Sequence, residues 1–227
     1  MPTTRPNEIS SDTSLKQRPR ENDRIKFEGF GKSNYRSREV GEAFRNLDMA
    51  RIIRLIYPAT ETQSPLLSNY RKRPRLQFLD AGLLSSSLMI QGDMIGVTDL
   101  NDFFRGKIIQ QLIYQEYTSV MEDPGFKPQF WVREEKGSDA EVDLVVQRNQ
   151  FAIPVEIKSG EKGTLRSLHQ FIEKANHPYA VRFYPGTLKI DKALTPSGKP
   201  YFLMNLPYYL ATRLPVYIDY FLTNFTE

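Results

Sequence analysis

The chain has 227 residues, a formal net charge of +4 and no cysteine, and 40% of its residues are hydrophobic. The absence of cysteine excludes disulfides and thiolate zinc sites, and the presence of only two histidines argues against His-rich zinc sites and most His-based nucleophilic triads. Because the N-terminus lacks a signal-peptide apolar region and no apolar run approaches membrane-spanning length, we expect a soluble cytoplasmic protein with no membrane partner.

Residues 1–23 are poor in apolar side chains, since only Met1, Ile9 and Leu15 are sizeable. Such a segment buries too little surface to offset the entropy of ordering, which predicts a disordered arm. From the start of the chain to Arg38 there are nine Lys or Arg residues against five Asp or Glu, whereas the remainder has 22 of each. This excess is typical of a tail that touches phosphate, and a solvated basic tail is the alternative.

Residues 24–75 form a second segment. Ser37 is a possible N-cap, and Val40, Phe44 and Leu47 follow at helical spacing. A β-branched strand over 52–57, ended by a proline, comes next. A helix that leads into a strand suits a winged-helix-like segment, in which Arg36 and Arg38 would face DNA; solvent or an ATPase domain are the alternatives for both arginines.

Residues 76–227 have the patterns of a larger domain. We expect a mixed sheet with helices on its faces, in the α/β class. Apolar periodicity predicts strands over 76–79, 130–133, 141–146, 151–158, 180–184 and 201–206, and helices over 101–120 and 164–175. Residues 83–98 fit no element firmly, and 147–150 predict a turn.

Charged residues interrupt the apolar strands of the predicted hairpin. Glu156 and Lys158 are two residues apart, so they share one strand face, and regular alternation puts Asp143 and Glu141 on one face of the preceding strand. Glu116, from the helix before them, would complete the group. Carboxylates beside a lysine suit Mg²⁺-dependent phosphodiester hydrolysis, because Mg²⁺ prefers oxygen ligands and activates water, and the lysine stabilises developing charge. An ordinary polar hairpin face with cross-strand ion pairs is the alternative.

The spacing of Asp143 and the tripeptide from Glu156 to Lys158 resembles the PD-(D/E)XK motif of the restriction-endonuclease-like superfamily, with Val142 where a proline sometimes stands. A longer set of segments resembles the C-terminal domain, of uncharacterised function, in a large group of prokaryotic AAA-type ATPases. These segments are 34–40, 57–58, 80–84, 106–116, 130–134, 138–143, 155–160 and 165–171. The resemblance extends roughly from Arg24 to Leu222.

The resemblance implies a role for each matching residue. Asp143, Glu156 and the Ile157 carbonyl would be the metal ligands, and Lys158 the catalytic lysine. Glu116 would be the acidic residue of the first helix, and Gln170 a DNA or substrate contact; Arg166 is a surface residue that could touch phosphate.

Two functions remain open at this point. The first is a nuclease that uses Mg²⁺, or Mn²⁺, to cleave DNA and works with an AAA ATPase. Relatives carry an ATPase domain and this sequence has none, so a fragment, a split gene with the ATPase in trans, and a domain that works alone are the alternatives. The segment Gly29 to Ser33 is not a phosphate-binding loop, since that motif would need glycine at Lys26. The second is a catalytically silent module that binds DNA or regulates the ATPase, and a pure protein-interaction domain is a third possibility.

Overall fold

The computed structural model describes residues 24–87, 102–135, 138–158, 160 and 164–225. The predicted arm, 1–23, lies outside this range, as does most of the unassigned stretch 83–98. The chain divides into two compact units, one of Met1–Tyr57 with Tyr70–Leu100 and one of Pro58–Asn69 with Asn101–Glu227. This division differs from the predicted boundary after residue 75.

The first unit contains η1 (Phe30–Lys32), α2 (Ser37–Met49), β1 (Ile53–Ile56), β2 (Arg75–Phe78) and α3 (Ala81–Ser87). Helix α2 begins where the Glu39 carboxylate accepts the Arg36 N–H at 2.8 Å. Its apolar face buries Phe44, whose ring packs against Phe30 at a centroid distance of 5.1 Å. The expected helix-then-strand order is confirmed, and the winged helix itself stays a prediction.

The pairing of strand β2 explains why the observed units differ from the predicted boundary after residue 75. It pairs antiparallel with β1, with Leu55 opposite Leu76, and therefore belongs to the first unit. The sequence pattern predicted the strand but not the strand with which it pairs.

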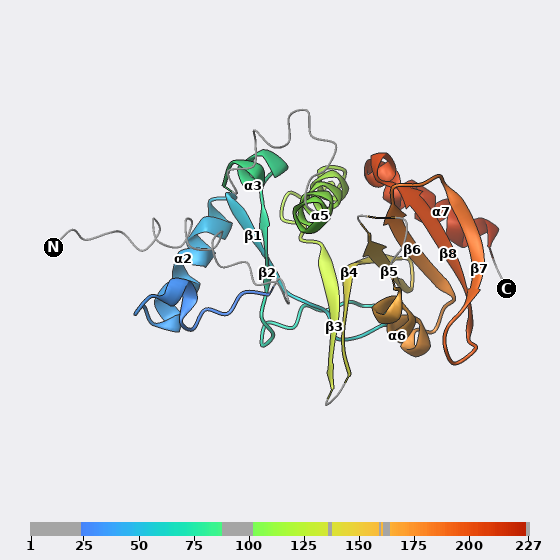
Figure 1. The fold of residues 1–227 in the computed structure, drawn as a ribbon, viewed down its shortest axis with the longest axis horizontal. Coiled ribbons are helices and arrows are strands. Elements are labelled where there is room, and N and C mark those ends of the chain that lie inside the picture. The colour runs from blue at the N-terminus through green and yellow to red at the C-terminus, as the bar shows by residue number, and fades with distance from the viewer. Residues whose placement is uncertain (1–23, 88–101, 136–137, 159, 161–163, 226–227) are drawn as a thin grey trace. The chain divides into compact units, whose positions relative to one another are not determined.

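The second unit is built on a six-stranded mixed sheet in the order β3-β4-β5-β6-β8-β7, which Figure 1 shows from β3 to β7. Strands β3, β4 and β5 are antiparallel, β5, β6 and β8 are parallel, and β7 is antiparallel to β8. The elements are α5 (Asp102–Ser119), β3 (Gln129–Glu135), β4 (Ser138–Arg148), β5 (Phe151–Ile157), α6 (Arg166–Lys174), β6 (Tyr179–Tyr184), β7 (Lys189–Leu194), β8 (Pro200–Pro207), η2 (Tyr208–Arg213) and α7 (Leu214–Asn224).

Helices cover both faces of this sheet. On one face, the α5 residue Ile113 and the α7 residue Phe221 pack with Val155 of β5 in one buried cluster. On the other face, α6 buries Phe171 against Val142 and Ala152, and Leu168 and Ile172 against β6 and β8. Burying each large apolar side chain stabilises the fold by about 1.5–3 kcal/mol. The predicted fold class, a mixed α/β sheet flanked by helices, is therefore confirmed.

Strand β7 was not predicted. Its sequence mixes three charged residues with three apolar ones without regular alternation, and every one of its side chains is exposed or half-buried. Such an edge strand has no apolar run, so the pattern that identifies central strands does not find it. No helix in the described part of the chain is both long and apolar enough to cross a membrane.

Candidate functional site

A β-bulge in β4 sets the direction of Asp143. Pairing with β3 changes register between Gln129 opposite Val145 and Trp131 opposite Val142, so β4 has one extra residue there. Val142 consequently packs on the α6 side of the sheet and Leu144 on the α5 side. Regular alternation would put these two side chains on one face, and the bulge inverts the alternation locally.

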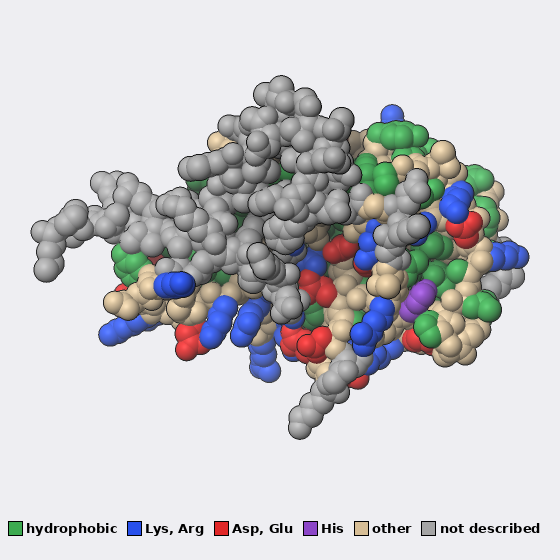
Figure 2. All heavy atoms as spheres, viewed as in Figure 1, with side chains coloured by type: hydrophobic (Ala, Val, Ile, Leu, Met, Phe, Trp, Pro, Cys, Tyr) green, Lys and Arg blue, Asp and Glu red, His purple; other side chains and the backbone are tan. Residues whose placement is uncertain are grey.

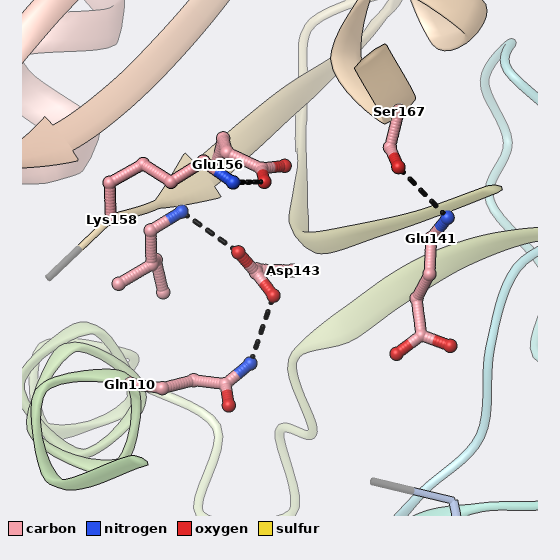
Figure 3. Close-up of polar contacts among 7 residues, drawn as sticks. Gln110, Glu141, Asp143, Glu156, Lys158 and Ser167 are labelled. Carbon is pink, nitrogen blue, oxygen red and sulfur yellow. Dashed lines mark hydrogen bonds and ion pairs between the residues drawn. The ribbon is translucent and has the colours of Figure 1, made fainter. Parts of the chain in front are cut away.

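The Asp143 carboxylate points to the end of β5. Its Oδ2 accepts the Ile157 N–H at 2.9 Å and its Oδ1 accepts the Gln110 side-chain amide at 3.1 Å (Figure 3). The Tyr114 hydroxyl donates to the Asp143 carbonyl. Leu144 opposite Val155 is the last backbone pair between β4 and β5, so the carboxylate lies where the two strands separate. The bulge thus converts a strand residue into a half-buried acceptor at a fork in the sheet.

Glu156 and Lys158 form an ion pair on one face of β5. The Lys158 Nζ lies 2.5 Å from Glu156 Oε1, with side-chain exposures of 25% and 8%. The neighbours Val155 and Ile157 pack on the α5 side, so the charged pair is on the opposite face. The Lys158 backbone is fixed as well, since its N–H donates to the Phe183 carbonyl at 3.0 Å. The predicted shared face of Glu156 and Lys158 is confirmed.

The main chain adds a further oxygen to this group. In an extended strand the N–H and C=O of one residue point to the same edge, and the Ile157 N–H points to Asp143. The Ile157 carbonyl is therefore on the edge that Asp143 faces. Two carboxylates and one carbonyl at a strand end are hard oxygen donors, the type that Mg²⁺ and Mn²⁺ accept. The described residues include no group of three or more His, Asp or Glu side chains that could hold a metal.

Glu116 is not brought to the group. Gln110 and Tyr114 of α5 both bond Asp143 and lie four residues apart on one helix face. Glu116 follows Tyr114 by two residues, about 200° around the helix axis, and its carbonyl accepts a hydrogen bond from the Ser119 hydroxyl. Sequence reasoning missed Gln110, although a polar residue one turn before the buried Tyr114 is the available signal.

Glu141 is also separate from the site. Its backbone N–H donates to the Ser167 hydroxyl of α6 at 3.4 Å, and its carboxylate points away from Asp143 (Figure 3). The register change lies between Val142 and Val145, after Glu141, so the expected common face of Glu141 and Asp143 stays a prediction.

The predicted nucleic-acid contacts fall in different places. Gln170 lies on α6 three residues after Ser167 and is half-buried, and its Oε1 has no hydrogen-bond partner within the described residues. Arg166 is exposed at the first turn of α6. Arg36 and Arg38 are exposed residues of the first unit. On the face in Figure 2, basic and acidic side chains of the second unit are mixed rather than gathered in one basic area.

Residues 105–198 match a family model described as a domain of unknown function, DUF4143. The match begins within α5, ends before β8 and includes Asp143, Glu156 and Lys158, but it spans less than half of the chain. No curated protein and no solved structure matches the chain. The segment that carries the candidate site is thus similar to DUF4143, a family that has no assigned function.

Proposed function

We propose that the second unit is a metal-dependent nuclease-like domain of the PD-(D/E)XK type that hydrolyses phosphodiester bonds in DNA. The observation that carries the proposal is the bulge that aims the Asp143 carboxylate at the end of β5. Glu156, Lys158 and the Ile157 carbonyl belong to that same strand end. The Asp143 carboxylate, bonded to Gln110 of α5, and the Glu156–Lys158 pair, on the opposite face of β5, lie at the same strand end. The proposal requires that one cation and one phosphate bridge them there.

Asp143, Glu156 and the Ile157 carbonyl would hold Mg²⁺ or Mn²⁺, which when bound lowers the pKa of a coordinated water and neutralises phosphate charge. The Ile157 N–H and the Gln110 amide orient the Asp143 carboxylate. The Lys158 ammonium is partly exposed and carries three donors, so it can contact a phosphate oxygen or the attacking water while it remains beside Glu156. Arg166, in the first turn of α6, and Gln170, in the middle of that helix, are proposed DNA contacts.

Calorimetric titration with Mn²⁺ and a cleavage assay on several DNA forms test this proposal. Asp143→Asn should abolish Mn²⁺ binding, and Lys158→Met should retain binding but lose cleavage. Glu141→Gln is the matched control, because it removes an acid from the same strand whose carboxylate points elsewhere. The metal site is wrongly assigned if Asp143→Asn binds Mn²⁺ as tightly as the parent, and cleavage that persists in Lys158→Met would identify a contaminant.

A second candidate is favoured by the internal pairing of the same groups. Lys158 already neutralises Glu156, and both Asp143 oxygens already accept hydrogen bonds, so the site is stable without a cation. In this case the domain is a silent nuclease-fold module that binds DNA or regulates an AAA-type ATPase. Salt-dependent DNA binding that survives Asp143→Asn, with no cleavage under any divalent metal, would favour this candidate.

The association with an AAA-type ATPase in trans is proposed from the sequence resemblance alone. Addition of this protein to the separately purified ATPase should change its rate of ATP hydrolysis. An unchanged rate over a range of protein concentrations would remove this part of the proposal.

A further inference from the structure

A patch of four side chains continues the candidate site onto the next strand. Glu156 of β5 is paired in parallel register with Arg182 of β6, and the Lys158 N–H bond to the Phe183 carbonyl extends the ladder by one step, toward Tyr184. Side chains at paired positions share a face, so Glu156, Lys158, Arg182 and Tyr184 form two adjacent columns. The patch is at the carboxyl ends of the parallel strands, where ligands of α/β sheets bind.

The charge of this patch is positive because Arg182 is not neutralised. Lys158 and Glu156 cancel each other, whereas the guanidinium of Arg182 lies 4.8 Å from the centroid of the Tyr184 ring. Within the described part of the chain the Arg182 side chain has no hydrogen bond or ion pair, and its Nε is buried without an acceptor. A stacked guanidinium keeps its fork of donors free for a planar or tetrahedral anion.

A neighbouring acceptor shows that polar groups continue across the sheet. Asn205 of β8 is paired with Arg182, and its Oδ1 is buried without a hydrogen-bond donor among the described residues. The Asn205 amide nitrogen is bonded to Asp191 at 2.9 Å, which fixes the orientation of the side chain. Buried polar atoms without a partner are rare in proteins, and a bound water or ion is one physical explanation for them.

We infer that Arg182 is a phosphate-binding residue that holds the DNA backbone beside Glu156 and Lys158. The inference rests on the proposed function, because it names the group that positions the substrate of that site. The guanidinium donates to the non-bridging oxygens of a phosphate next to the one attacked, and the Tyr184 ring keeps it in place. Lysine cannot replace it fully, since an ammonium lacks the planar fork.

Binding of a fluorescent duplex of about 20 base pairs, measured by anisotropy in EDTA and again in Ca²⁺, tests the inference. Arg182→Met should weaken binding about tenfold and lower the slope of log K against log salt by about 0.9, the value for one lost phosphate contact. The DNA affinity of Arg182→Lys should lie between that of the parent and that of Arg182→Met. Lys192→Met is the matched control, because Lys192 also lies over an aromatic ring, Phe202, but on the edge strand β7.

The outcomes separate this inference from the proposed function. The inference is overturned if Arg182→Met binds DNA with the same affinity and the same salt dependence as the parent. It is also overturned if the parent binds no DNA. Calorimetry with Mn²⁺ reports on the metal site independently and should give the same affinity for Arg182→Met and the parent. If the parent binds DNA through Arg182 but binds no Mn²⁺, the nuclease proposal fails and the phosphate contact stands.

Discussion

Substitution of Asp143 separates its structural role from its proposed chemical role. The carboxylate accepts one bond from the Ile157 N–H and one from the Gln110 amide. A hydrogen bond to a charged group contributes about 1.5–3 kcal/mol and a weaker side-chain bond about 1 kcal/mol. Asp143→Ala should therefore lower the free energy of unfolding by about 2–4 kcal/mol in the absence of metal, because the Ile157 N–H at the fork loses its acceptor.

Asp143→Asn should cost about 1 kcal/mol or less. The amide oxygen can still accept the Ile157 N–H, and the Gln110 side chain can rotate its amide so that its oxygen accepts from the new NH₂ group. Urea unfolding at pH 7 in EDTA measures both variants against the parent. Equal stability of the Ala and Asn variants would refute the assignment of Asp143 as the acceptor that holds the strand fork.

The same unfolding measurement with Mn²⁺ reports on the metal site. A ligand at one hundred times its Kd stabilises the folded state by about 2.7 kcal/mol. The parent should gain that amount and Asp143→Asn should gain nothing. The fold and the metal site are thus measured in one assay, with Asn as the variant that changes only the second.

Two further predictions concern stability. The buried His177 imidazole accepts the Tyr179 N–H at 3.2 Å and bonds the Ala152 carbonyl at 2.8 Å, and burial lowers its pKa below the usual 6.5. Below pH 6.5 the unfolded state therefore binds more protons than the folded state, so the contribution of His177 to the free energy of unfolding should be complete above pH 6.5. As the pH falls below 6.5, the free energy of unfolding should fall by at most about 1.4 kcal/mol per pH unit. His177→Gln should flatten this pH dependence, and an unchanged slope contradicts the reasoning. The Lys199 ammonium donates to the Ile172 and Ala175 carbonyls at the end of α6, both at 2.7 Å. Lys199→Met should therefore lower the free energy of unfolding by about 1–3 kcal/mol, measured by thermal unfolding. The control variant Lys192→Met should lower it by about 0.5 kcal/mol or less. Equal melting temperatures for these two variants would rule out the capping role.

Much of the fold could be predicted from the spacing of apolar side chains within short segments. The strands of the hairpin, the turn between them and the apolar stripe of α6 were predicted within a few residues, because each depends on the spacing of side chains in one short segment. The shared face of Glu156 and Lys158 followed for the same reason, since a regular strand fixes the direction of side chains two apart.

The arrangement of the site depended on distant parts of the chain. The β4 bulge arises from pairing with β3, and it puts Val142 and Leu144 on opposite faces of the sheet. Likewise, the rotation of α5 is set by the burial of Ile113 and Tyr114 against the sheet, and this rotation presents Gln110 rather than Glu116 to Asp143.

The sequence by itself therefore determined most of the central strands and the helices α5 and α6, but not β7, and it determined which residue types are available. These are two carboxylates and a lysine on a hairpin, with no cysteine and little histidine. Only the tertiary structure decided which of these groups meet, and it added Gln110 and Arg182 beside them. The physical reason is that periodicity is a property of a single segment, whereas strand register, bulges and helix rotation are set when segments far apart in the chain bury their apolar faces together.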